Sequence, residues 1–121
     1  MREILVIDDD TLTRWSLAQV LTRAGYSVLE AGSASEGLTQ VQAAAPDLVF
    51  LDCCLPDGDG VSVLQTLQEL RPSLPVVMIS ADAPRETARN MCRLGAHDCL
   101  EKPCSPTLVV ALAGSLLGPP T

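Results

Sequence analysis

Residues 48–52 read Leu-Val-Phe-Leu-Asp, a wholly apolar run that ends in a single carboxylate. Residues 4–10 follow the same pattern, with Ile-Leu-Val-Ile ahead of three aspartates, and residues 76–79 form a third run, Val-Val-Met-Ile. Continuous apolar runs of this length are typical of strands covered on both faces, and such strands belong to parallel sheets. Weaker strand signals at residues 28–29 and 99–100 bring the expected number of strands to five.

Helix-length stretches separate these strands. The first runs from about Thr11 to Ala24 and stops at Gly25, a residue suited to the position after a helix end. The second begins with a capping box at residues 33–36. Further helices are expected at about residues 61–70, 84–95 and 106–117, each bounded by proline or glycine. Alternating strands and helices predict an α/β domain with a doubly wound, five-stranded parallel sheet over residues 1–117, followed by a linker at residues 118–121.

Composition narrows the function. The chain of 121 residues is 47% hydrophobic and carries a net charge of −7, so it folds around a sizeable core and repels phosphate backbones. Aromatic residues make up only 2%, which leaves few platforms for stacking bases. We therefore expect no direct binding of nucleic acid by this domain.

Compartment is predicted from the cysteines and the apolar runs. The five cysteines are an odd number without CxxC spacing, which favours a reducing cytoplasm over a disulfide framework. The longest uncharged apolar run, residues 108–118, is about half the ~20 residues that a membrane span needs, and no signal peptide precedes the first strand. A cytoplasmic protein without a membrane partner is expected.

Polar side chains follow the predicted strands where each strand ends. Asp8, Asp9 and Asp10 follow the first strand, Asp52 the third, Ser80 the fourth and Lys102 the fifth. Each has an ordinary interpretation alone, such as a turn, a helix cap or a solvated charge. Ligands of such folds, however, bind at the carboxyl edge of the sheet, where these groups meet. Clustered carboxylates suit Mg²⁺, a lysine suits a phosphoryl oxygen, and together they predict a magnesium and phosphoryl site.

These motifs resemble the receiver domain of two-component response regulators. The resemblance rests on residues 5–10, 51–52, 55–60, 79–81 and 100–103, in order and over nearly the whole chain. It implies a flavodoxin-like (βα)5 fold with strand order 2-1-3-4-5. It further implies a phosphorylation-dependent switch that is not a classical enzyme, although it assists its own phosphoryl transfer and autodephosphorylation.

The resemblance assigns roles to individual residues. Asp52 is implied to accept a phosphoryl group from a phosphohistidine on a sensor histidine kinase. Asp8 and Asp9 are implied to hold Mg²⁺ with Asp52 and the backbone carbonyl of Cys54. Ser80 is implied to be the switch hydroxyl and Lys102 the phosphoryl-binding lysine. A cis Lys102-Pro103 bond and a glycine at the start of the third helix, Gly60, also belong to the pattern.

Finer features leave alternatives open. Residues 95–103 and 15–17 are similar to receivers that precede enhancer-type ATPase transcription activators, although a free-standing receiver is the other interpretation. Cys99 stands where the family usually has Tyr or Phe, so the aromatic rotamer switch cannot operate as usual. Cys54 and Asp82 stand at the positions that tune hydrolysis of the phosphoryl group in the family.

Two rival functions come from other classes. A phosphatase of the haloacid dehalogenase type would use Asp8 as nucleophile and Asp10 as acid, but Leu12 departs from that motif. A thiol sensor would use the cysteines, but a nearby acidic cluster should raise thiol pKa values and so lower reactivity. We expect the cysteines to be small apolar filler.

Two surfaces are expected to contact partners. Trp15 should be at least partly exposed on the first helix, where the resemblance places a docking kinase; packing against the last helix is the alternative. Residues 105–121 carry no charged side chain, and the apolar residues of the last helix lie nearly all the way round it. A phosphorylation-dependent homodimer through the fourth helix, fifth strand and fifth helix, or cover by a C-terminal effector domain, would account for them.

Overall fold

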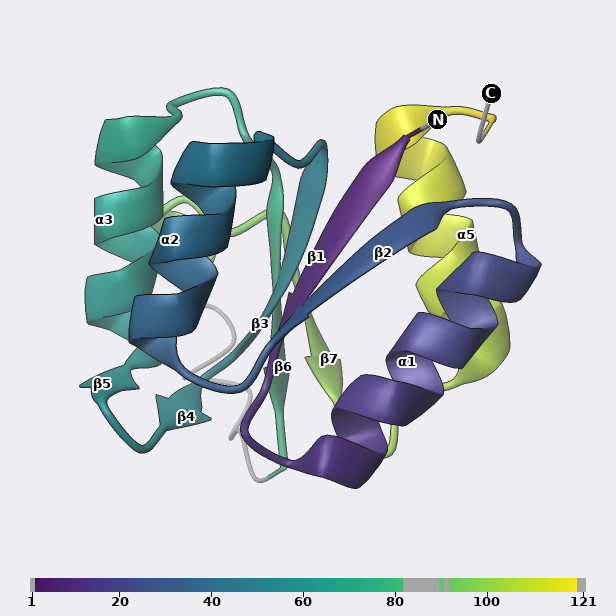
Figure 1. Ribbon diagram of the computed structural model, residues 1–121, viewed down its shortest axis with the longest axis horizontal. Coiled ribbons are helices and arrows are strands. Elements are labelled where there is room, and N and C mark those ends of the chain that lie inside the picture. Colours follow the sequence, from purple (N-terminus) through teal and green to yellow (C-terminus); the bar gives the residue numbers. More distant parts are fainter. Residues whose placement is uncertain (1, 82–89, 91, 120–121) are drawn as a thin grey trace.

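The computed structural model describes residues 2–81, 90 and 92–119. Five parallel strands form one sheet in the order β2-β1-β3-β6-β7 within these residues, which confirms the predicted topology (Figure 1). The strands are β1 (Glu3–Ile7), β2 (Ser27–Ala31), β3 (Leu48–Asp52), β6 (Val76–Ser80) and β7 (Asp98–Glu101).

The apolar runs become the two-sided core. Every residue of β3 and β6 is buried, and so are four of the five residues of β1. Because side chains alternate along a strand, each run supplies two separate clusters. Leu5, Val49 and Met78 belong to the cluster beneath α2 and α3. Ile4, Phe50 and Val77 belong to the cluster beneath α1 and α5.

Each described helix begins at a capping side chain, as residues at this position satisfy free backbone N–H groups. The helices are α1 (Thr11–Arg23), α2 (Ala34–Ala44), α3 (Gly60–Leu70) and α5 (Pro106–Leu117). Their caps, Asp10, Ser33, Asp59 and Ser105, each accept a backbone N–H from the first turn. Figure 1 shows α2 and α3 on one face of the sheet and α1 and α5 on the other. The start of β1 and the end of α5 lie at the opposite edge from the carboxyl ends of β1 and β3.

The expected fourth helix falls largely outside the described residues, as does Asp82. Its end is described: the Leu94 N–H donates to the Asn90 carbonyl at 3.0 Å, and Gly95 adopts a positive φ of 112°. This conformation favours glycine and agrees with the predicted stop at residue 95. Among the described helices, none is both long enough and apolar enough to span a lipid bilayer.

A small antiparallel ribbon after β3 was not expected. It consists of β4 (Cys54–Leu55) and β5 (Gly58–Asp59), with Cys54 opposite Asp59. Strands of two residues carry too little periodicity to be recognised from sequence. At its base, the Gly60 N–H donates to the Cys53 carbonyl at 2.8 Å, and a Cβ at residue 60 would lie 2.8 Å from the Cys53 Cα. Glycine is therefore needed for this close approach.

The exposed apolar surface of α5 is narrower than the sequence predicts. Val109 and Ala113 are fully buried, while Leu112, Leu116 and Leu117 pack partly against the core. Leu108 is the large α5 side chain that remains exposed, with 48% of its surface accessible. The difference arises because α5 lies against both α1 and the sheet, which cover more than one stripe of the helix.

Candidate functional site

The carboxyl ends of β1, β3 and β7 bring two acidic side chains and one lysine into contact. The Lys102 Nζ lies 2.8 Å from the Asp8 Oδ2 and 3.2 Å from the Asp52 Oδ2. Asp8 has no exposed surface, Asp52 is 5% exposed, and the Lys102 side chain is 15% exposed. The ammonium group therefore bridges two buried carboxylates that would otherwise repel each other.

The backbone orients both carboxylates. The Asp10 N–H donates to the Asp8 Oδ1 at 2.9 Å, and the Cys54 N–H donates to the Asp52 Oδ1 at 3.1 Å. The two Oδ2 atoms are thereby left facing Lys102. The Asp8 Oδ2 receives no well-aligned hydrogen bond from the described residues, and its contact with Lys102 is an ion pair. This oxygen can therefore still bind a cation.

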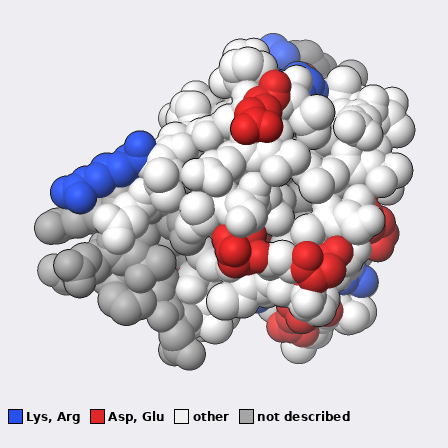
Figure 2. Space-filling model, turned by 90° about the vertical axis from the view of Figure 1, so that its left-hand side faces the viewer, with Lys and Arg blue, Asp and Glu red and all other residues white. Residues whose placement is uncertain are grey.

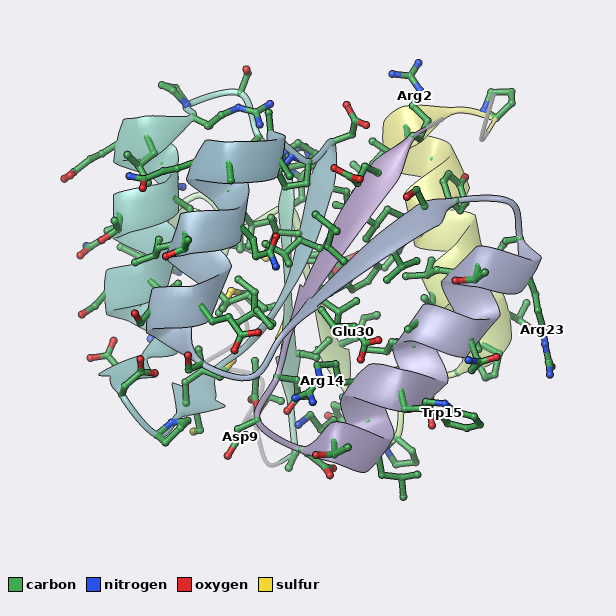
Figure 3. The ribbon with its side chains drawn as sticks, in the orientation of Figure 1. Arg2, Asp9, Arg14, Trp15, Arg23 and Glu30 are labelled. Atoms are coloured by element: carbon green, nitrogen blue, oxygen red, sulfur yellow. The ribbon has the colours of Figure 1, made fainter. Side chains whose placement is uncertain are left out.

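Asp9 completes an acidic cluster with these two residues. Carboxylate oxygens of Asp8, Asp9 and Asp52 all lie within 4.8 Å of one another. Figure 3 shows Asp9 at the carboxyl edge of the sheet, beyond the end of β1. These carboxylates fit Mg²⁺, which prefers oxygen ligands and keeps several waters. Asp9 is exposed, and the buried Asp8 Oδ2 has no hydrogen bond from the described residues.

Burial shapes the protonation of the site. Desolvation raises the pKa of Asp52 to about 6; the Cys54 N–H opposes this rise, while Asp8 adds to it. For Lys102, burial acts to lower the pKa, but Asp8 and Asp52 outweigh it and hold the pKa above its usual value. The ammonium is therefore charged at neutral pH, while the Asp52 carboxylate is held in an unfavourable ionised state that a cation would relieve.

Ser80 and Cys54 lie at the rim of this cluster. Ser80 ends β6, is 8% exposed, and its carbonyl accepts the Lys102 N–H at 2.8 Å. Cys54 is exposed and begins the ribbon after Asp52. The peptide bond between Lys102 and Pro103 is cis, as the resemblance implied. All six residues predicted for the site, Asp8, Asp9, Asp52, Cys54, Ser80 and Lys102, thus lie at one edge of the sheet.

Asp10 is occupied elsewhere. Its Oδ1 accepts the Leu12 N–H at 3.3 Å and its Oδ2 accepts the Thr13 hydroxyl at 2.6 Å, both in the first turn of α1. The Thr13 hydrogen bond is the main reason why the pKa of Asp10 lies below its usual value. A carboxylate in this state caps a helix and is poorly suited to act as the general acid of a phosphatase.

Arg14 is a site neighbour that sequence reasoning missed. Its Nη1 donates to the Asp8 carbonyl at 2.7 Å, and its Nε pairs with the Glu30 Oε1 at 3.2 Å. Figure 3 shows Arg14 and Glu30 facing each other between α1 and β2. An arginine and a glutamate sixteen positions apart carry no local signal, because only the packing of α1 against β2 brings them together.

Three of the five cysteines, Cys53, Cys99 and Cys104, are poor nucleophiles. Burial is the largest cause that raises the pKa of Cys53, to about 11, and it also raises the pKa values of Cys99 and Cys104. The sequence predicted that these thiol pKa values are raised, but by the acidic cluster. In the structure desolvation raises them more than the neighbouring acidic groups do. Cys53 and Cys99 pack against the core, which favours the role of apolar filler.

An apolar groove adjoins the site on the α1 side. It has a volume of about 330 Å³ and lies between α1 and the chain that leads from Lys102 into α5. Its lining includes Leu12, Ser16, Pro103 and Pro106. Trp15 is 55% exposed and extends from α1 away from the sheet (Figure 3), as the sequence predicts.

Comparison with known proteins identifies the family. Residues 4–113 match the model of the response regulator receiver domain. The DNA-binding transcriptional regulator NtrC of Bradyrhizobium sp. (strain RP501 Parasponia) is 37% identical over 117 residues, which are 97% of this chain and 24% of that protein. The transcriptional regulatory protein PhoP of Bacillus subtilis (strain 168) is 34% identical over 116 residues, 96% of this chain and 48% of the relative. The chain thus spans about a quarter to a half of these relatives.

Solved structures agree with this assignment. The receiver domain of NtrX from Brucella abortus superposes with a TM-score of 0.90 at 37% identity, covering 94% of this chain and 97% of that one. A CheY-like receiver domain protein from Methanospirillum hungatei JF-1 superposes with a TM-score of 0.88 at 32% identity, covering 96% and 94% of the two chains. The chain therefore belongs to the receiver domain family of two-component response regulators.

Proposed function

We propose that the Asp52 carboxylate accepts a phosphoryl group from a phosphohistidine of a sensor histidine kinase. In this step a carboxylate oxygen forms a bond to phosphorus, the bond from phosphorus to the histidine nitrogen breaks, and the nitrogen keeps the electron pair. The observation that carries the proposal is the contact of Lys102 with both buried carboxylates, 2.8 and 3.2 Å away. The same ammonium group can hold an oxygen of the incoming phosphoryl group.

The remaining site residues have supporting roles. Asp8, Asp9, Asp52 and the Cys54 carbonyl would hold Mg²⁺, which when bound neutralises charge on the phosphoryl oxygens. The Ser80 hydroxyl would donate a hydrogen bond to an oxygen of the phosphoryl group after transfer. The chain then acts by positioning and charge neutralisation, so it assists its own phosphorylation and dephosphorylation without being a classical enzyme.

The output we propose is control of transcription, within the cytoplasm, through a C-terminal effector domain. The similar proteins NtrC and PhoP are transcriptional regulators, and this chain covers 24% and 48% of their lengths. Figure 2 shows the α2–α3 face, on which the Asp and Glu side chains are separated from one another. Among the described residues on this face, Lys and Arg side chains form no extended basic patch. Phosphate backbones bind clustered Lys and Arg side chains, so we assign DNA contact to the effector and not to this face. The alternative phosphatase function would require Asp8 to be the nucleophile.

The proposal is tested by incubating the protein with acetyl phosphate and Mg²⁺ and mapping the modified residue by mass spectrometry. We expect one phosphoryl group on Asp52, dependent on Mg²⁺. Asp52→Asn should incorporate none, because the nucleophilic oxygen pair is lost. The matched control, Asp59→Asn, removes an exposed aspartate of the β4–β5 ribbon and should label as the wild type does. Phosphate on Asp8, or full labelling of Asp52→Asn, would overturn the assignment.

A further inference from the structure

Asp57, at the turn of the β4–β5 ribbon, forms a long-range contact with α2. Its Oδ1 accepts the Ala34 N–H at 2.8 Å and its Oδ2 accepts the Ser35 N–H at 3.0 Å. The two partners are 23 and 22 positions away in the chain. The two oxygens of one carboxylate therefore bind two consecutive amides in the first turn of a helix that belongs to a different part of the fold.

The contact completes the cap of α2. The first turn of a helix leaves its N–H groups without partners inside the helix. The Ser33 Oγ accepts the Glu36 N–H at 3.2 Å, and Asp57 takes the two N–H groups before it. These two backbone hydrogen bonds are the main causes that lower the pKa of Asp57, so the group is charged at neutral pH and complements the positive end of the helix.

The ribbon that carries Asp57 also carries one side of the phosphoryl site. It leaves β3 at Asp52, whose Oδ1 holds the Cys54 N–H at 3.1 Å. The Cys53 N–H donates to the Ile79 carbonyl at 2.9 Å, and its carbonyl accepts the Gly60 N–H at 2.8 Å. The base of the ribbon is thus fixed to β6 and α3, while its turn is fixed to α2 through Asp57.

We propose that Asp57 is a positioning residue: by tying the ribbon to the first turn of α2, it holds the Cys54 carbonyl where Mg²⁺ is bound. This inference rests on the proposed function, because it takes the Cys54 carbonyl as a metal ligand. Without the tie, the ribbon remains joined to β6 and α3 but its turn is released, so binding Mg²⁺ must also order the ribbon. The cost of ordering lowers the affinity.

The coupling must act in both directions. If the tie raises the affinity for Mg²⁺, then Mg²⁺ raises the stability of the tie by the same factor. The amide protons of Ala34 and Ser35 report this directly, because Asp57 is their acceptor. In the wild-type protein, addition of Mg²⁺ should change the NMR shifts of both amides and slow their exchange with solvent. In Asp57→Ala both responses should be lost.

Two control variants separate the tie from its side effects. Ser33→Ala removes the other cap of the same helix end and leaves the ribbon attached. Asp59→Ala removes an equal charge from the same ribbon, but Asp59 caps only its own helix through Ser62, three positions away. Loss of helix stability is thus matched by the first control, and loss of negative charge by the second.

Mg²⁺ affinity is measured by titration calorimetry, and stability by urea unfolding without Mg²⁺. We expect Asp57→Ala to weaken Mg²⁺ binding about 3- to 10-fold. This is less than the roughly 10- to 100-fold loss typical of groups that hydrogen-bond to a metal ligand, because Asp57 acts only through the backbone of the ribbon. Ser33→Ala and Asp59→Ala should bind Mg²⁺ as the wild type does. At saturating Mg²⁺, the maximal rate of Asp52 labelling by acetyl phosphate should be the same in all four proteins. Asp57→Asn keeps one acceptor oxygen and should give an intermediate affinity, which preserves the test if the alanine variant unfolds.

The proposal is overturned if Asp57→Ala and Asp57→Asn bind Mg²⁺ with wild-type affinity. It is equally overturned if either control variant weakens binding as much as Asp57→Ala, because helix stability or charge would then explain the effect. A wild-type protein that neither binds Mg²⁺ nor labels at Asp52 would instead overturn the proposed function. The two failures are therefore distinguishable.

Discussion

At the scale of single residues, Asp52 is held in a state that it does not favour. It is buried next to Asp8, and desolvation raises its pKa from 3.8 to about 6. In the unfolded chain the carboxyl ionises near 4, so between about pH 4 and 6 the folded protein binds the extra proton. Ionisation of Asp52 therefore lowers the free energy of unfolding. The decrease begins near pH 4 and reaches its full size above about pH 6.

Replacing Asp52 with asparagine should remove this penalty. We expect Asp52→Asn to be more stable than the wild type at pH 7.5 by on the order of 2 kcal/mol, and nearly equal to it at pH 4. Urea unfolding without Mg²⁺ at a series of pH values measures the difference. Asp10, Asp57 and Asp59 have lowered pKa values and lose stabilising contacts as the pH falls, but they are common to both proteins and cancel. A difference that does not grow between pH 4 and 7.5 would contradict the raised pKa.

At the scale of elements, α1 combines a capped start at the site with an exposed apolar side. Leu12 and Trp15 are 69% and 55% exposed and stand three positions apart. Side chains at this spacing share one side of a helix. Leu12 also lines the apolar groove beside the site. The alternative in which Trp15 packs against α5 is not supported by an exposure above one half.

Exposed tryptophans beside a site often dominate binding of a partner. We expect Trp15→Ala to slow phosphotransfer from the cognate kinase about tenfold or more, while labelling by acetyl phosphate stays unchanged. Leu70→Ala is the matched control, since Leu70 is an exposed apolar residue at the end of α3, on the opposite face of the sheet. Rates are compared with purified phosphorylated kinase. Equal rates for the wild type and Trp15→Ala would exclude docking on this side of α1.

At the scale of the whole molecule, charge is distributed unevenly between the elements. The net charge is −7, yet residues 105–121 contain no charged side chain. Leu108 is exposed at the start of α5, while Val109 and Ala113 are buried against the core. A single exposed leucine is ordinary on a protein surface. The absence of charge along the whole of α5 is therefore the main reason to expect a partner there, and two-fold pairing is the usual arrangement of identical chains.

Phosphorylation should therefore promote self-association through a face that includes α5. With a beryllofluoride mimic of the phosphoryl group, we expect sedimentation to detect a dimer, and Leu108→Ser should weaken that dimer. Because Cys99 replaces the usual aromatic residue, the signal from Ser80 would travel by a shift of the backbone and not by burial of a ring. A protein that stays monomeric with and without the mimic at high concentration would leave the effector domain as the partner of α5.

The five-stranded sheet and the edge at which the polar side chains gather could be predicted from the amino-acid sequence alone. This was possible because β1, β3 and β6 are buried on both faces, so their composition is continuous and apolar, and because carboxyl ends of parallel strands meet at one edge. Helix caps such as Ser33 could also be predicted, because a cap lies only three positions before the residue whose backbone N–H it accepts.

The contacts between polar groups that are distant in the sequence could not be predicted, because they depend on how the elements pack. Arg14 meets Glu30, and Asp57 meets Ala34 and Ser35, over separations of 16 to 23 positions. Such pairs produce no periodic pattern in the sequence, because strand pairing and helix packing bring their members together. The rise in the pKa of Asp52 has the same origin: it is set by desolvation and by Asp8, and both exist only once the chain is folded.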